Sequence, residues 1–377
     1  MSELPGLRPA WVEVDLDAVR ANTRVLVERA APAALLAVVK ADGYGHGAEQ
    51  VARAALDAGA SWLGVALVEE GMTLREQGID ARILVLSEPP PAAAGAVVAH
   101  GLTPTVYTAG GIDALAKAVV DAGTGAPLPV HLKVDTGMHR VGCTVDDAAG
   151  LVDLVGSRPE LELEAVCTHF AAADETDQPY TNEQIERFEA LLRVLDDAGS
   201  RPRLVHAANS AGLLAHPRAH YDLVRVGIAL YGVPPAPALV DRIPLRAVLS
   251  LRARVSHVKE LPAGSRVSYG LRYELARAGR LCTVPIGYAD GVPRNLGIVG
   301  GEVLIQGARM PIAGTVTMDQ LMVDAGDVPV DVGDEVVLLG AQGDDEITAG
   351  EWADRLGTIA YEIVTGIGSR VPRRYTT

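Results

Sequence analysis

The chain has little of several things that define large classes of proteins. Aromatic residues make up 4% of its 377 residues, so we expect a core of small aliphatic side chains. The formal net charge is −15, and no cluster of lysine or arginine stands out in the sequence. Because phosphate binding needs a basic surface, nucleic acid is excluded as an expected partner.

Cysteines and long apolar runs are also scarce. Cys143, Cys167 and Cys282 are an odd number without a CxxC spacing, which argues against a disulfide framework and against a zinc site. They predict reduced thiols in a cytoplasmic protein that holds no metal. No apolar run reaches the roughly 18 residues of a membrane-spanning helix, and residues 1–10 lack the apolar stretch of a secretion signal. We therefore expect no membrane partner.

What the sequence does have is a large apolar fraction, 49%, arranged in a repeating order. Short apolar runs alternate with longer segments of helical spacing. The runs are Leu35–Val39, Trp62–Val65, Ile83–Leu86, Leu102–Val106, Val130–Val134, Leu163–Thr168, Leu204–Ala207 and Leu223–Val226. The helical segments include Ala48–Ala58, Glu69–Gln77, Ile112–Ala122, Val145–Val155 and Asn182–Ala198.

This alternation predicts an α/β fold with a parallel sheet, because such strands are joined by right-handed crossovers. Eight units over about 200 residues favour a closed (β/α)₈ barrel of the TIM type. The alternative is an open, doubly wound sheet. The segment Lys40–Gly47 argues against it, since it is not the GxGxxG fingerprint expected after the first strand.

The last third of the chain has a different pattern. A proline-rich segment at residues 233–244 reads as a linker. Beyond it, short β-branched runs are separated by glycine and aspartate turns, as in Ala253–Leu261, and one helix is expected at Ala349–Leu356. We predict a barrel over residues 1–240, followed by a smaller, mostly antiparallel β domain over residues 241–377.

Lys40 is the first candidate for chemistry. It directly follows the apolar run Leu35–Val39, at the end of the first predicted barrel strand. Burial disfavours the charged form of a lysine, and the neutral amine can attack an aldehyde to form a Schiff base. The alternative is an ordinary surface charge where a strand meets solvent.

Other polar residues follow the predicted barrel strands, where barrel enzymes carry their active sites. They are Tyr44, Lys133, Asp135, Arg140, His169, His206, Asn209, Ser210 and Arg225. A barrel often binds phosphate in the loops after strands seven and eight, which here contain Asn209–Ser210 and Gly227–Ile228. Alone, Ser210 could be a helix N-cap and Gly227 a plain turn residue. Together with a lysine after strand one, these loops predict pyridoxal phosphate.

The β domain adds two tyrosines between turn residues. Tyr269 lies in Val267–Gly270, and Tyr288 lies in Pro285–Gly291. The alternative for Tyr269 is a half-buried aromatic whose hydroxyl reaches water. A third polar turn contains Asp319, which could equally be a β-turn aspartate.

With these residues in view, the chain resembles the alanine racemase family nearly end to end. The most specific segment is Ala37–Gly47, AVVKADGYGHG. The supporting segments are Lys133–Arg140, Thr168–Phe170, His206–Ala211, Arg225–Gly232, Val267–Gly270, Pro285–Gly291, Met318–Gln320 and Tyr361–Arg373. The resemblance implies a barrel that binds pyridoxal phosphate and a β domain that completes the active site.

The resemblance also implies how the cofactor is held. Lys40 would bind it as an aldimine. Arg225 would face the pyridine nitrogen, His169 would pack beside the ring, and Arg140 would approach the ring hydroxyl. The phosphate would be held by Tyr44, Ser210, Gly227, Ile228 and Tyr361, and Asn209 is counted with the cofactor-binding residues.

For the reaction, the resemblance implies interconversion of L- and D-alanine by proton transfer at Cα. Lys40 and Tyr269 would be the two opposite bases, and Lys133 would be the lysine that is often carbamylated in the family. The substrate site would be lined by Arg140, Tyr288, Met318 and Asp319. In the family Tyr269 comes from the second subunit, so a homodimer with shared active sites is expected, with D-alanine used for peptidoglycan.

Several rival functions are compatible with the same architecture. A racemase of another amino acid such as serine comes first, and a barrel decarboxylase follows. A non-catalytic protein that binds pyridoxal phosphate is a third, although it is expected to lack a second domain. The pair Leu271-Arg272, together with Thr315 and Thr317, departs from the family pattern. We expect these departures to affect the access channel and substrate range, and not the two bases.

Overall fold

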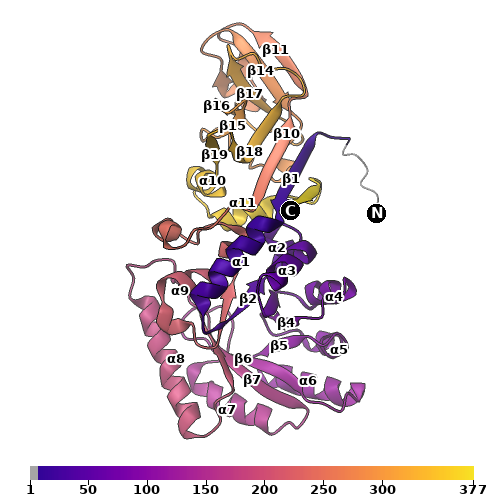
Figure 1. Ribbon diagram of the computed structural model, residues 1–377, viewed down its shortest axis with the longest axis vertical. Coiled ribbons are helices and arrows are strands. Elements are labelled where there is room, and N and C mark those ends of the chain that lie inside the picture. Colours follow the sequence, from indigo (N-terminus) through magenta and orange to yellow (C-terminus); the bar gives the residue numbers. More distant parts are fainter. Residues whose placement is uncertain (1–6) are drawn as a thin grey trace. The chain divides into compact units, whose positions relative to one another are not determined.

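The computed structural model describes residues 7–377, which divide into two compact units (Figure 1). The first unit, here the barrel unit, comprises residues 19–43 and 48–246. The second, here the β unit, comprises the chain up to Ala18, residues 44–47 and residues 247–377. None of the helices formed by residues 7–377 is long and apolar enough to cross a membrane.

The barrel unit contains one sheet of eight strands in the order β8-β7-β6-β5-β4-β3-β2-β9, in which all ladders are parallel. The strands are β2 (Ala34–Val38), β3 (Trp62–Val65), β4 (Arg82–Val85), β5 (Thr103–Val106), β6 (Leu128–Lys133), β7 (Leu161–Cys167), β8 (Leu204–His206) and β9 (Leu223–Val226). Backbone bonds from Asp222 to Val205 (3.0 Å) and from Arg225 to Ala208 (2.9 Å) join the two ends of the sheet. The predicted barrel is confirmed.

Helices connect the strands, as the apolar spacing predicts. They are α1 (Leu16–Ala30), α3 (Ala48–Asp57), α4 (Val68–Glu76), α5 (Ala94–Ala99), α6 (Ala109–Ala122), α7 (Val145–Gly156), α8 (Tyr180–Asp197) and α9 (Ser210–Ala215). In α8 the buried residues Ile185, Phe188, Leu192 and Leu195 form one stripe. The apolar spacing does not predict α5, because its Ala-Gly-Ala-Val-Val-Ala sequence has no polar face from which a helical period could be read.

The β unit is built around two main sheets, beside a two-stranded sheet of β12 (Arg266–Val267) and β13 (Tyr273–Glu274). The larger has the order β16-β15-β18-β10-β1-β20, and β19 also pairs with β18. Its strands are β1 (Ala10–Asp15), β10 (Leu249–Arg254), β15 (Glu302–Ile305), β16 (Ala308–Pro311), β18 (Glu335–Gln342), β19 (Asp345–Ile347) and β20 (Arg373–Thr376). The smaller consists of β11 (His257–Leu261), β14 (Gly279–Val284) and β17 (Leu321–Gly326). Helices α10 (Ala349–Leu356) and α11 (Ala360–Gly366) follow β19.

Most ladders of the β unit are antiparallel, as predicted, and the expected helix at Ala349–Leu356 is present. The run Ala253–Leu261, expected as one strand, is instead split between β10 and β11, which lie in different sheets. The bend falls at residues 255–256, between the two strands.

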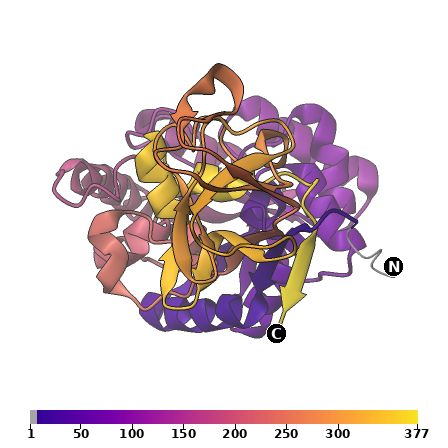
Figure 2. The ribbon, with the colours of Figure 1, turned by 90° about the horizontal axis from the view of Figure 1, so that it is seen from above.

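The N-terminal strand differs from the expected domain division, which places residues 1–240 in the barrel. β1 pairs antiparallel with β10 and parallel with β20, which lies at the edge of the sheet (Figure 2). Val12 and Val14 of β1 are fully buried. Alternation predicts a half-buried strand here but cannot say which sheet receives it. The second change of unit, after Arg246, lies close to the expected boundary.

Candidate active site

Lys40 begins a short turn of unusual handedness directly after β2. The segment α2 (Lys40–Tyr44) is not an ordinary α-helix, because Ala41, Asp42 and Gly43 have φ values of 52°, 52° and 61°. A left-handed conformation costs an ordinary L-residue about 1–2 kcal/mol. Such strain persists only where surrounding contacts enforce it. The backbone that carries Lys40 is therefore held in place from outside.

Glu70, near the start of α4, supplies one of these contacts. Its Oε1 accepts a hydrogen bond from the N–H of Ala41 (2.6 Å). Its Oε2 accepts from the N–H groups of Ala66 (2.8 Å) and Leu67 (3.1 Å), which follow β3. One carboxylate thus ties the loops after two neighbouring strands together and fixes the turn next to Lys40.

The surroundings of Lys40 favour its neutral amine. Burial lowers the pKa of Lys40, and the positive charge of Arg140 lowers it further, whereas Glu70 opposes both effects. A lysine must lose its proton before it can act as a nucleophile or base. The direction of the shift is the one that the Schiff-base hypothesis requires.

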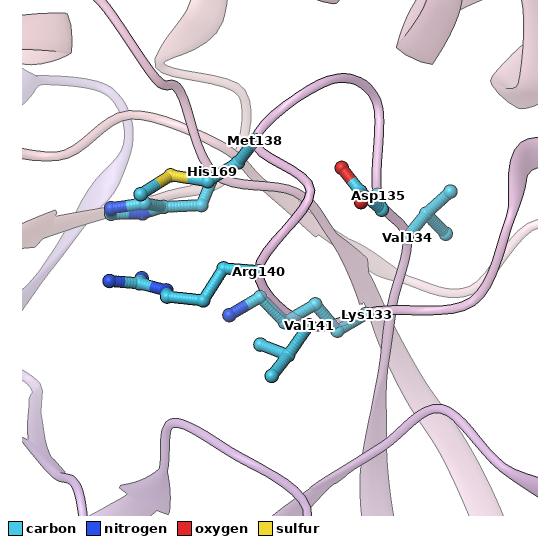
Figure 3. Close-up of a pocket in the computed structure, with 7 residues that line it drawn as sticks. All are labelled: Lys133, Val134, Asp135, Met138, Arg140, Val141 and His169. Carbon is cyan, nitrogen blue, oxygen red and sulfur yellow. The ribbon is translucent and has the colours of Figure 1, made fainter.

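A pocket lies at the carboxyl end of β6 and in the loop that follows (Figure 3). It is lined by Lys133, Val134, Asp135, Met138, Arg140, Val141 and His169. Burial lowers the pKa of the Lys133 ammonium group to about 8, and nearby cations act in the same direction. Asp135 accepts backbone hydrogen bonds from Gly137 (2.9 Å) and His139 (3.0 Å), which folds the loop that carries Arg140.

Arg225, in β9, is buried and surrounded by neutral acceptors. Its Nη1 contacts Nδ1 of His206 at 2.7 Å. Its Nη2 donates to the carbonyl oxygens of Thr168 (2.9 Å) and Ala207 (2.8 Å) and contacts Nδ1 of His169 at 3.1 Å. A guanidinium only donates hydrogen bonds, so both imidazoles must accept at Nδ1. Burial, followed by the charge of Arg225, lowers the pKa of His169 well below its usual value.

The two predicted phosphate loops meet at a single hydroxyl group. Oγ of Ser210 accepts hydrogen bonds from the backbone N–H groups of Gly227 (3.0 Å) and Ala229 (3.4 Å). Ser210 is not the N-cap of α9. That role belongs to Asn209, whose side chain accepts from the N–H of Gly212 (2.8 Å). Hydroxyl and N–H donors from two neighbouring loops are the kind of groups that bind a phosphate.

Tyr269 lies in a strained turn of the β unit and is 70% exposed. On either side of it, Ser268 and Gly270 have φ values of 64° and 78°. Thr315 braces this turn: its hydroxyl donates to the carbonyl of Tyr269 (3.1 Å), and its own carbonyl accepts from the Ser268 hydroxyl (2.5 Å). Thr315 therefore contacts the backbone of Tyr269, and the expectation that the departures from the family pattern do not touch the two predicted bases is wrong at this position.

The predicted substrate residues of the β unit are organised around Asp290. This aspartate is fully buried and binds Arg8 through both oxygens, at 2.9 Å each. It also accepts from the N–H of Gly287 (3.0 Å), which begins the turn that carries Tyr288. A Cβ at Gly287 would lie 2.3 Å from the carbonyl of Thr317, so only glycine permits this approach.

The segment that carries Met318 and Asp319 lies against the same turn. The N–H of Tyr288 donates to Thr317 (3.0 Å), and the N–H of Ala289 donates to Met318 (3.0 Å). Asp319 is exposed and binds Arg370 (2.7 Å), which also approaches Asp290 at 3.4 Å. The structure thus brings together Tyr288, Met318 and Asp319.

Two further predicted cofactor residues also belong to the β unit. The rings of Tyr44 and Tyr361 lie 6.3 Å apart, centre to centre. Burial raises the pKa of Tyr44 to about 12, so its phenol stays protonated at neutral pH. The candidate residues therefore fall into two groups. One lies in the barrel unit and contains Lys40, Lys133, Arg140, His169, Asn209, Ser210, Arg225, Gly227 and Ile228; the other lies in the β unit.

Two known protein families match this chain, and together they cover nearly all of it. The family described as alanine racemase, N-terminal domain, matches residues 14–235. The family described as alanine racemase, C-terminal domain, matches residues 248–375. The chain belongs to the alanine racemase family. This confirms the resemblance inferred from the sequence.

Two alanine racemases and one histidine racemase are similar to this chain over nearly its whole length. An alanine racemase of Symbiobacterium thermophilum is 52% identical over 374 residues, which cover 99% of this chain and 98% of the relative. The crystal structure of alanine racemase from D-cycloserine-producing Streptomyces lavendulae has a TM-score of 0.93 and 41% identity, and the match covers 100% of this chain and 98% of that chain. A histidine racemase from Leuconostoc mesenteroides has a TM-score of 0.89 and 32% identity, with 99% of each chain covered.

Sequence reasoning missed the carboxylates that support this site. Glu70 and Asp290 accept hydrogen bonds from backbone N–H groups and interact with cationic side chains. Neither follows the end of a predicted barrel strand, where the candidate residues were sought. Glu164, inside β7, reads in the sequence Leu-Glu-Leu-Glu-Ala as one residue of a solvated strand face, although it is 1% exposed. For Asp290, its place within the matched segment Pro285–Gly291 is a signal that could have been used.

Proposed function

We propose that this member of the alanine racemase family interconverts L- and D-alanine and uses pyridoxal phosphate to do so. The observation that carries the proposal is Lys40, a lysine with a lowered pKa directly after the first barrel strand. Family membership supplies the reaction class, and the donors around Ser210 and Arg225 fit the two polar ends of the cofactor.

The cofactor would be held by the residues that the family resemblance assigns to it. Its phosphate would be bound by Tyr44, Ser210, Gly227, Ile228 and Tyr361, with Asn209 fixing the start of α9. Arg225 would donate to the ring nitrogen, His169 would lie beside the ring, and Arg140 would lie near the ring hydroxyl. When bound, pyridoxal phosphate supplies an electron sink that makes the Cα proton of an amino acid removable.

The chain itself supplies the bases. Racemisation removes the Cα proton from one face and returns a proton to the opposite face. A single base would tend to return the proton to the side it came from, whereas two bases allow inversion in both directions. Lys40 would serve one enantiomer and Tyr269 the other. Tyr288, Met318, Asp319 and Arg140 would position the substrate.

We propose a homodimer in which each β unit completes the partner's site. In this chain Tyr269 is 70%, Met318 is 53% and Tyr288 is 40% exposed. These three large side chains belong to the predicted catalytic and substrate residues, and they are exposed enough to line the pocket of a second subunit. The three cysteines are free and buried, which supports the cytoplasm as the proposed location.

Lys133 is proposed to be carbamylated. A pKa of about 8 leaves a useful fraction of neutral amine near pH 7, and a carbamate forms when the neutral amine adds to carbon dioxide and releases one proton. The product would carry a negative charge next to Arg140, which lines the same pocket. A charge pair would then replace two neighbouring cations.

The alternative substrate is another amino acid. The histidine racemase with the same fold makes this a specific possibility, and serine is a second candidate. A non-catalytic protein that binds pyridoxal phosphate is less well supported, because a complete second domain with Tyr269 accompanies the barrel.

The proposal is tested by incubating L-alanine and D-alanine with the holoenzyme in deuterated water. We expect wild type to produce the opposite enantiomer with deuterium at Cα. Tyr269→Phe should lower racemisation by about 10²–10⁴-fold, the range typical of a lost general base, while one enantiomer still exchanges its proton through Lys40. If wild type with bound pyridoxal phosphate leaves alanine unchanged, alanine is not the substrate. Histidine and serine should then be tested.

A further inference from the structure

A chain of buried polar side chains crosses the interior of the barrel unit and ends at Arg225. Nη1 of Arg225 contacts Nδ1 of His206 at 2.7 Å. Nε2 of His206 lies 3.0 Å from Nδ1 of His131, and Nε2 of His131 lies 3.2 Å from Oε2 of Glu164. The exposed fraction of both histidines and of Glu164 is 1% or less. Such a polar chain is costly to bury unless its hydrogen bonds are complete.

The two ends of this chain fix every proton in it. A carboxylate can only accept, so His131 must donate to Glu164 from Nε2, which leaves its Nδ1 as an acceptor in the neutral ring. His206 then donates from Nε2 to His131 and presents an unprotonated Nδ1. A guanidinium can only donate, and Nδ1 of His206 is the acceptor that Arg225 meets. Starting from either end gives the same two tautomers.

A break in strand register positions the carboxylate. Leu163 of β7 pairs with Val130 of β6, but the next pair joins Ala165 to His131, so Glu164 is an additional residue in β7. A β-bulge of this kind re-aims a side chain and is a feature rather than a defect of a barrel. Here it coincides with Glu164, whose carboxylate meets His131.

Two arginines hold Glu164 in its charged form. Arg82 binds both of its oxygens, at 2.6 and 2.5 Å, and Arg203 also contacts Oε1. Burial raises the pKa of Glu164, but hydrogen bonds from His131 and Arg82 outweigh it and bring the pKa down to about 2. Burial lowers the pKa of His131 and of His206, which agrees with two neutral rings.

Arg225 itself has no carboxylate among the hydrogen-bond partners described above, which are two backbone carbonyls and two imidazoles. A buried cation needs a compensating negative potential. Glu164 provides the carboxylate that hydrogen bonds connect to it, through His131 and His206.

We propose that Glu164 is a positioning residue of the active site: through His131 and His206 it fixes the tautomer that receives Arg225 and so orients the guanidinium. The inference rests on the proposed function, in which Arg225 meets the cofactor's ring nitrogen. Glu164 acts at a distance, because His131 and His206 lie between it and Arg225.

The first test is the proton position in the wild-type protein. Nitrogen NMR of protein carrying ¹⁵N-histidine, with and without pyridoxal phosphate, distinguishes a protonated ring nitrogen from a bare one. Substitution of each of the nine histidines in turn assigns the signals. We expect His131 and His206 each to carry one proton, on Nε2. A proton on Nδ1 of His206, or a doubly protonated ring, overturns the proposal.

The second test breaks the chain at two points in the holoenzyme. Glu164→Gln removes the charge, and His131→Phe removes the link while leaving the contacts of Glu164 with Arg82 and Arg203. We expect His206 to lose its single tautomer, the absorption spectrum of bound pyridoxal phosphate to change, and kcat to fall about tenfold with a smaller change in KM.

The matched control is Glu335→Gln, which removes a carboxylate bound to Arg252 (2.6 Å) in the β unit. It should leave the spectrum and the tautomers unchanged. If both barrel variants keep the wild-type spectrum and His206 tautomer, the positioning role is wrong. A failure of the proposed function would be recognised separately, since wild type would then bind no pyridoxal phosphate or would leave alanine unchanged, whereas the wild-type tautomers can be measured without cofactor or substrate.

Discussion

At the scale of single residues, the active-site face of the barrel unit is rich in cationic side chains, and burial lowers the pKa values of its two lysines. Lys40 and Lys133 both have lowered pKa values, and burial is the first cause in each case. Arg140 lowers both further, while Arg225 stays charged because a guanidinium does not lose its proton in proteins. The face therefore carries one permanent buried charge beside two amines that are ready to lose theirs.

The carboxylate of Glu70 raises the pKa of Lys40, and its removal should change the pH dependence of cofactor capture. Glu70→Gln removes the carboxylate that raises the pKa of Lys40, so we expect that pKa to fall further. The measurement is the rate at which cofactor-free protein captures pyridoxal phosphate as a function of pH. Because capture needs the neutral amine, its midpoint should move to lower pH. Glu69→Gln, an exposed neighbour in α4, is the control; equal midpoints in the two variants would contradict this account.

Lys133 should destabilise the fold when it is protonated. Its pKa is about 8 in the folded chain and near 10.4 in an unfolded one. Below pH 8 the full cost is present, and it disappears as pH rises toward 10.4, where both states are neutral. Lys133→Met should therefore raise the free energy of unfolding by about 1–3 kcal/mol at pH 7, with a gain that shrinks as pH rises.

The measurement is urea unfolding in carbonate-free buffer across this pH range, because a carbamate would remove the ammonium group. Lys117→Met is the matched control, since the side chain of Lys117 is 73% exposed. A gain for Lys133→Met that does not depend on pH would show that packing, and not charge, is responsible.

At the scale of elements, turns rather than strands carry the candidate residues of the β unit, and a buried carboxylate holds two of them together. Asp290→Asn keeps the shape but weakens the bonds to Arg8 and to Gly287. We expect a loss of about 1–3 kcal/mol in the free energy of unfolding, as for a buried polar group left unsatisfied; both arginine partners are partly exposed and can turn to water.

Asp319→Asn provides the comparison, because Asp319 binds the same Arg370 but is itself exposed. An exposed ion pair contributes about 0–1 kcal/mol. Chemical denaturation of the two variants, read by circular dichroism, gives both values. Equal losses would mean that burial of Asp290 has no special role.

Elements also show what a sequence can and cannot predict. The carboxyl ends of the barrel strands place Lys40, Arg225 and Ser210 near their observed positions, because strand alternation and helical spacing are local patterns. The bulge at Glu164 shifts the register by one residue. The alternation of apolar and polar residues along a strand cannot predict where such a bulge occurs. The left-handed turn after Lys40 is enforced by Glu70, far along the chain, so local propensity could not indicate it.

At the scale of the whole molecule, the proposed sharing of sites makes a quantitative prediction. Lys40→Ala and Tyr269→Phe should each be nearly inactive alone. Mixed and allowed to exchange subunits, they should regain activity, because a mixed dimer pairs one intact Lys40 with one intact Tyr269. Random exchange gives about half mixed dimers with one good site each, so we expect about a quarter of wild-type activity.

The control mixes Lys40→Ala with a Lys40→Ala, Tyr269→Phe double variant, in which no combination is intact. Sedimentation of the same samples reports the oligomeric state. If the first mixture stays inactive although subunits exchange, each site is built within one chain and the proposed sharing is wrong.

The position of β1 has a consequence for how the chain is made. During synthesis β1 is made long before its neighbours β10 and β20, which begin at Leu249 and Arg373. While the barrel segments are being made, the apolar side chains of Val12 and Val14 cannot be buried in the sheet that they occupy in the folded protein. Pairing across such sequence separation slows folding and leaves an unpaired strand open to wrong partners. The ladder of β1 with β10 can therefore form only after the barrel segments have been made, and its ladder with β20 forms later still.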